Sequence, residues 1–96
     1  MQNNQKEILL IAQEECAEVT QAISKVFRFG IDGVHNGRSN REHLEEELGD
    51  LQCMIDLMID EGLINQEKMW AAHGRKLEKL KTWSNIFKKR KSNEVF

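Results

Sequence analysis

The chain has 96 residues, no proline and only six glycines, and 31% of its residues are charged. A chain of this length predicts one domain, and the absence of proline favours long helices joined by few turns. The net charge of −2 argues against an overall affinity for nucleic acid or for an anionic membrane surface.

The first predicted helix runs roughly from Asn4 to Arg28. The segment 30–38 follows it and has three glycines in nine residues. That composition predicts a turn-rich, mobile loop, which we expect to close over a bound ligand as a lid. The apolar residues of the helix recur at helical spacing and include Ile8, Ala12, Val19, Ile23 and Val26.

A second helix is predicted to begin after Ser39, because Ser39 and Glu42 have the spacing of a capping box. Gly62 stands where a glycine commonly ends a helix. The apolar stripe of this helix consists of Leu44, Leu48, Leu51, Ile55 and Met58.

Asn65 is predicted to cap a third helix, which runs roughly from Gln66 to Leu80. A short fourth segment, Ser84 to Lys89, precedes a basic tail, residues 88–96, which we expect to be flexible. Residues 1–96 therefore predict a single all-α domain, an antiparallel bundle of about four helices. So short a chain buries little core, and we expect a homodimer or homotetramer to complete the bundle.

Four carboxylates lie where the helical pattern predicts apolar residues. In the second helix, Glu47 and Asp50 fall within the apolar arc, while the other polar residues take the opposite face. In the first helix, Glu15 falls in the middle of the apolar stripe and Glu18 at its edge. Each pair has i,i+3 spacing, which directs both side chains to one side of a helix.

Carboxylates that face an interior need positive charge, because burying one without a partner costs several kcal/mol. No lysine or arginine stands at a matching interior position. All-oxygen ligands suit Mg²⁺, with Mn²⁺ as a substitute, so the pattern predicts a four-carboxylate metal cage. The alternative is two ordinary acidic helices whose glutamates pair with lysines of their neighbours.

The motifs that carry these carboxylates are similar to a known signature. Glu14-Glu15-Cys16-Ala17-Glu18, followed by Glu46-Glu47-Leu48-Gly49-Asp50-Leu51, resembles the Glu-x-x-Glu and Glu-x-x-Asp motifs of the MazG-like all-α nucleoside triphosphate pyrophosphohydrolases. The likeness extends roughly from Glu7 to Leu80. The insert between the motifs has 28 residues, near the long end of the family's range. The chain lacks the tandem arrangement of the larger MazG proteins, so their substrate preferences do not transfer.

This resemblance implies a fold of helices around a four-helix core, often completed by a second subunit. It also implies hydrolysis of a nucleoside triphosphate to a monophosphate and pyrophosphate. The Mg²⁺ of that reaction would be held by the four motif carboxylates, which here are Glu15, Glu18, Glu47 and Asp50.

Other charged residues are candidates for contacts with substrate. Glu14 is placed to orient or deprotonate a water molecule, although a solvated carboxylate explains it equally well. Lys25, Arg38, Lys76 and Lys79 are candidates for binding the triphosphate, and each has the alternative of a solvated charge.

Two other functions are alternatives to a metal-dependent enzyme. A non-catalytic helical interaction module would explain the helices but not the carboxylates on apolar stripes. A nucleic-acid-binding module would depend on the basic tail, which gives weak, salt-sensitive binding.

Cys16 and Cys53 lack metal-ligand spacing, and neither a signal peptide nor a membrane span is recognisable, so we expect a cytoplasmic protein. Base and sugar preference, the number of metal ions and the biological role stay open.

Overall fold

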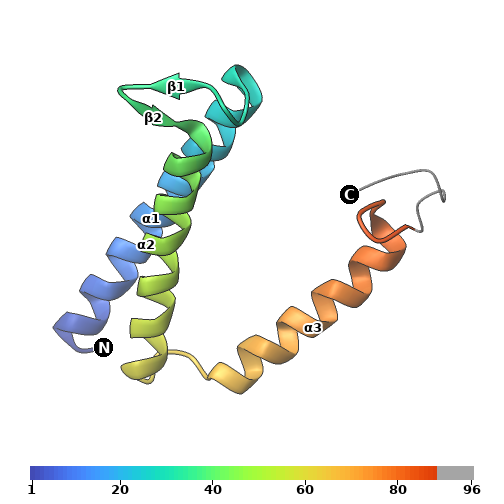
Figure 1. The fold of residues 1–96 in the computed structure, drawn as a ribbon. Helices are drawn as coiled ribbons and strands as arrows, with labels where there is room; N and C mark the ends of the chain where they lie inside the picture. The colour runs from blue at the N-terminus through green and yellow to red at the C-terminus, as the bar shows by residue number, and fades with distance from the viewer. Residues whose placement is uncertain (89–96) are drawn as a thin grey trace. The chain divides into compact units, whose positions relative to one another are not determined.

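The computed structural model describes residues 1–88, which fall into two compact units: Met1–Ile64, and a second unit that begins at Asn65. The predicted flexible tail, residues 88–96, lies outside the described residues except for Lys88. The elements follow one another along the chain (Figure 1) as α1 (Asn3–Phe29), β1 (Val34–His35), β2 (Arg38–Ser39), α2 (Asn40–Asp60) and α3 (Gln66–Trp83).

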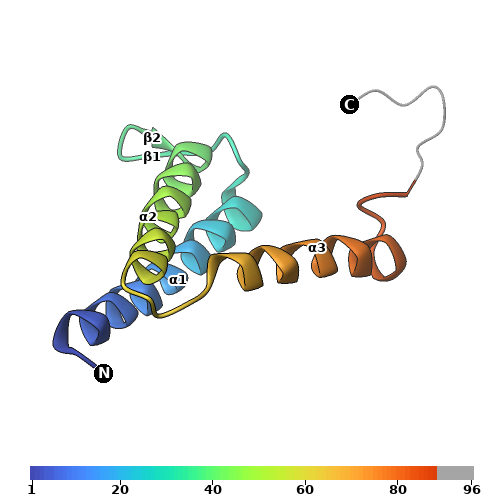
Figure 2. The same ribbon diagram turned by 90° about the horizontal axis from the view of Figure 1, so that it is seen from below.

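The first unit consists of two long helices that lie side by side and run in opposite directions (Figures 1 and 2). The bounds of α1 confirm the predicted helix to within one residue at each end. It ends at Gly30, whose φ of +84° favours glycine and whose backbone N–H donates to the carbonyl oxygen of Val26.

The segment predicted as a turn-rich, mobile loop contains a short antiparallel β-hairpin instead. Val34 pairs with Ser39 and His35 with Arg38. The two turn residues, Asn36 and Gly37, both have positive φ, at 54° and 76°. An Asn-Gly pair in this conformation is the favoured two-residue connection, because its twist matches that of the flanking strands.

The beginning of α2 confirms the predicted capping box. The hydroxyl of Ser39 accepts from the backbone N–H of Glu42 at 3.1 Å, and the Glu42 carboxylate accepts from the N–H of Ser39 at 3.2 Å. The helix ends before Gly62, which has a φ of +73°. Ile8, Ala12 and Met54 form the buried core between the two helices. Many large apolar side chains of this unit stay exposed, among them Leu10, Ile23, Leu48 and Leu57.

The second unit contains α3, which begins where predicted, with Asn65 as its cap. It extends beyond the predicted end at Leu80 to Trp83. The short fourth segment expected at Ser84 to Lys89 is not helical over residues 84–88. Ser84 is extended, and its hydroxyl accepts from the N–H of Ile86, a local bond that replaces a helical one. Residues 1–88 therefore hold three helices, and in this range no helix combines the length and apolar character of a bilayer span.

Candidate metal centre and adjoining pockets

Three of the four predicted ligands come together between α1 and α2. Glu15, Glu47 and Asp50 each offer a carboxylate oxygen, and these oxygens lie within 4.8 Å of one another. Glu15 comes from α1, and the other two come from α2 at i,i+3 spacing. The antiparallel packing of the helices thus brings both halves of the predicted cage to one place.

The environment of Glu15 fits a cation. Its Oε2 atom is shielded from solvent and has no hydrogen-bond partner in the described part of the chain. Burial raises the pKa of the Glu15 carboxyl, and the neighbouring charges of Asp50 and Glu47 raise the pKa further. A buried carboxylate oxygen that faces only other carboxylates is unfavourable by itself, and a hard divalent cation would provide the missing partner.

Glu18, the fourth predicted ligand, lies beside this group rather than within it. Its side chain is exposed, and its charge contributes to the raised pKa of Glu15. Unlike Glu15, it is not among the residues whose carboxylate oxygens lie within 4.8 Å of one another. It lines a neighbouring pocket instead.

His43 was not predicted as part of the site. Its Nε2 atom lies 3.4 Å from Oε1 of Glu47, and both side chains are 12% exposed. The sequence held a signal for this contact, because residues at i,i+4 on a helix lie on the same face. Glu47 therefore contacts His43 within α2 and lies close to Glu15 of α1.

A polar pocket of about 470 Å³ adjoins the carboxylates. Two of the predicted phosphate-binding residues, Lys25 and Arg38, contribute to it from α1 and from the hairpin. Arg38 also forms an ion pair with Glu46, which holds the guanidinium near the beginning of α2. The complete lining is Glu18, Gln21, Lys25, His35, Asn36, Arg38, Asn40 and His43.

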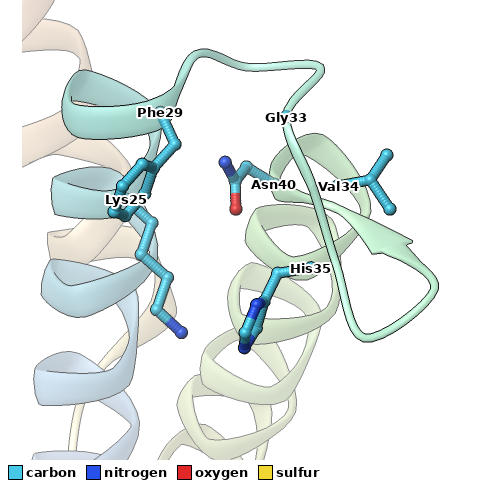
Figure 3. Close-up of a pocket in the computed structure, with 6 residues that line it drawn as sticks. All are labelled: Lys25, Phe29, Gly33, Val34, His35 and Asn40. Atoms are coloured by element: carbon cyan, nitrogen blue, oxygen red, sulfur yellow. The ribbon is translucent and has the colours of Figure 1, made fainter.

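A second pocket, of about 380 Å³, lies between the end of α1 and the hairpin (Figure 3). Phe29 is the aromatic residue of its lining, whereas the Val34 side chain points away from this space in Figure 3. It shares Lys25, His35 and Asn40 with the polar pocket, so the two pockets adjoin each other. In Figure 3 the ends of the Lys25 and His35 side chains face the same space.

The remaining predicted residues are not gathered at this place. Glu14 is exposed on α1 and belongs neither to the carboxylate group nor to the lining of the two pockets. Lys76 and Lys79 are exposed residues of α3, in the second unit. A role for them in binding substrate stays a prediction.

Comparison with known proteins gives a match to a protein family. A model of the MazG nucleotide pyrophosphohydrolase domain matches residues 3–81, a range that contains α1, the hairpin, α2 and all but the last two residues of α3. Searches of curated proteins and of solved structures give no match.

Proposed function

The chain belongs to the MazG nucleotide pyrophosphohydrolase domain family, and from that premise we propose that it is a Mg²⁺-dependent nucleoside triphosphate pyrophosphohydrolase. It would convert a (deoxy)nucleoside triphosphate and water to the monophosphate and pyrophosphate. The observation that best supports this proposal is the buried, unpartnered Oε2 of Glu15 beside Glu47 and Asp50. A cation at this point would lie next to a pocket lined by Lys25 and Arg38.

The residues of the chain divide the work between the metal and the substrate. Glu15, Glu47 and Asp50, with Glu18 from the adjoining turn, would hold Mg²⁺, and Mn²⁺ would substitute for it. When bound, the ion would neutralise phosphate charge and lower the pKa of a water molecule. Lys25 and Arg38 would bind phosphate oxygens and orient the substrate for attack at the α-phosphorus. Glu14 would orient the attacking water or accept its proton.

Our proposal includes a homodimer or homotetramer. The first unit covers few of its apolar side chains, and exposed leucines and isoleucine lie along both of its helices: Leu10, Ile23, Leu48 and Leu57. A second copy of the chain would cover such residues and complete a four-helix core. Light scattering at micromolar concentration tests this part, and a monomer would contradict it.

Product analysis tests the activity. The protein is incubated with each ribo- and deoxyribonucleoside triphosphate, with and without Mg²⁺, and the products are separated by ion-exchange chromatography. We expect monophosphate and pyrophosphate only with the metal, and none from Glu47→Gln. Glu45→Gln is the matched control, because Glu45 is an exposed residue of the same helix outside the carboxylate group. Equal activity of both variants would reject the site, and no turnover by the unmodified protein of any triphosphate would reject the activity.

A further inference from the structure

Asn40 is a buried polar residue at the first position of α2, and its orientation is fixed. Only 5% of it is exposed. Its side-chain amide nitrogen donates a hydrogen bond to the carbonyl oxygen of Gly30 at 2.9 Å. Its backbone N–H donates one to the carbonyl oxygen of Gly33 at 2.8 Å. Because the nitrogen is committed to Gly30, the side-chain oxygen is turned the other way. Figure 3 places it on the side of Lys25 and His35, towards the pocket.

The walls of this pocket suit a flat, apolar group. Phe29 is 65% exposed, so it presents uncovered apolar surface. The guanidinium of Arg28 lies over the Phe29 ring, 5.1 Å from its centre. Aromatic side chains of this kind stack on nucleobases. The pocket thus joins an apolar wall to one hydrogen-bond acceptor of fixed direction.

We infer that this pocket takes the base of the nucleotide, and that Asn40 reads its edge. The side-chain oxygen of Asn40 accepts a hydrogen bond and cannot donate one, so it matches an exocyclic amino group. Cytosine and adenine carry such a group, whereas uracil and hypoxanthine carry an oxygen at the equivalent position. The preferred substrates are therefore nucleotides of amino-bearing bases, an inference that rests on the proposed function.

The distances along the helices agree with one nucleotide spanning both pockets. Asn40 precedes Glu47 by seven residues on α2, and Lys25 follows Glu18 by seven residues on α1. Each interval corresponds to about 10 Å at the rise of an α-helix. The polar pocket, with Lys25 and Arg38, occupies this interval. A base beside Phe29 thus leaves the phosphates among these cations, on the side of the carboxylates.

The first test exchanges the amino group for an oxygen in the substrate, which leaves the protein unchanged. We expect kcat/KM to be about tenfold higher for CTP than for UTP, and about tenfold higher for ATP than for ITP. The amino group donates a hydrogen bond to the side-chain oxygen of Asn40, whereas the oxygen of UTP or ITP would repel it. Metal-dependent hydrolysis with equal kcat/KM within both pairs would overturn the inference and leave the proposed function standing.

The second test needs no hydrolysis. Uniformly ¹⁵N-labelled protein is titrated with CMP or UMP in the absence of metal, and ¹H–¹⁵N correlation spectra are recorded. We expect CMP to shift the Asn40 side-chain amide and the backbone amides of residues 29–40, with an affinity about tenfold above that of UMP. This result would support the inference even if no triphosphate were hydrolysed. Shifts confined to other residues, or equal affinities, would overturn it.

A pair of variants separates the pocket from the rest of α1. Phe29→Ala is expected to weaken CMP binding about tenfold, because the stacking surface is lost. Phe27→Ala is the matched control: Phe27 is 85% exposed, two residues away, and outside the pocket lining. Equal effects of the two substitutions on CMP affinity would contradict the placement of the base.

Discussion

The Nε2 atom of His43 lies 3.4 Å from Oε1 of Glu47, one turn further along α2. This contact connects the carboxylate group to the polar pocket, because His43 lines that pocket while Glu47 belongs to the proposed metal site. A side chain that holds a metal ligand in place acts on the ion through that ligand. We therefore predict that His43 acts as a positioning residue for Glu47.

We predict that His43→Ala weakens Mg²⁺ binding and lowers kcat/KM about 10- to 100-fold, the range seen when a residue that supports a metal ligand is removed. Mg²⁺ affinity is measured by isothermal titration calorimetry, which does not depend on turnover. His73→Ala is the control, because His73 lies on α3 against Trp70, at 5.0 Å between ring centres. If His43→Ala lowered activity at unchanged Mg²⁺ affinity, the role of positioning Glu47 would be wrong.

A second prediction concerns Glu15 and the stability of the metal-free protein. The folded protein raises the pKa of this carboxyl, chiefly by burial. An acid whose pKa is higher in the folded state favours unfolding once it is ionised, so its unfavourable effect is absent below the unfolded pKa of about 4.5 and complete above the raised folded pKa. Glu15→Gln should therefore raise the Tm of the metal-free protein at pH 7 and leave it nearly unchanged at pH 4.

Added Mg²⁺ should make the unmodified protein more stable than Glu15→Gln at pH 7. At a concentration 100 times its Kd, an ion that binds only the folded state stabilises it by about 2.7 kcal/mol. We expect this stabilisation for the unmodified protein and a loss of most of it for Glu15→Gln. The measurement is thermal unfolding of the unmodified protein and of Glu15→Gln, each with and without Mg²⁺ at pH 4 and pH 7. A metal-free Glu15→Gln protein that is less stable at pH 7 would contradict the assignment of Glu15 as an unpartnered buried carboxylate.

Much of the secondary structure was predictable because its signals are local. The caps Ser39 and Asn65 give the beginnings of α2 and α3 directly, since each satisfies a backbone N–H within three residues. The hairpin was missed because strands of two residues are too short for an alternating pattern. Its Asn36-Gly37 turn was the signal that carried the information.

The site was predictable only in part, because some of its contacts join residues of different elements. Periodicity placed Glu15, Glu47 and Asp50 on facing stripes, and the antiparallel packing brought them together. The ion pair of Arg38 with Glu46 depends on how the hairpin turns back against α2, and no spacing rule along one helix predicts that. The buried orientation of Asn40 likewise depends on its bond to Gly30, ten residues away.

A third prediction concerns the capping box of α2. Ser39→Ala removes the acceptor for the N–H of Glu42 and should lower the free energy of unfolding by about 1 kcal/mol, measured by urea denaturation.

The hydrogen bonds to Ser39 lower the pKa of Glu42 in the folded protein. A lowered folded pKa gives stability that is present above the unfolded value and is lost as the pH falls through the folded value. The effect of Glu42→Gln should therefore be greatest near neutral pH and disappear in acid; an effect that grew in acid would contradict this account.

A fourth prediction uses two glycines with opposite surroundings. A Cβ atom at residue 33 would lie 2.5 Å from the carbonyl oxygen of Phe29 and 3.1 Å from the side-chain nitrogen of Asn40, whereas one at residue 74 would meet nothing within 4 Å. Gly33→Ala must displace the segment that holds Asn40, and we expect it to destabilise the protein by about 1–3 kcal/mol. Gly74→Ala, within α3, should stabilise the protein by up to about 1 kcal/mol, because alanine favours a helix.

The same pair also reports on the pocket. Since Gly33→Ala pushes on the amide whose oxygen is proposed to read the base, it should reduce the ratio of kcat/KM for CTP over UTP as well as the Tm. Gly74→Ala should leave that ratio unchanged while it raises the Tm. The two measurements, made under conditions where both variants are folded, separate a loss of stability from a loss of base reading. A Gly33→Ala protein that is less stable but keeps the full ratio would show that Asn40 does not set the preference.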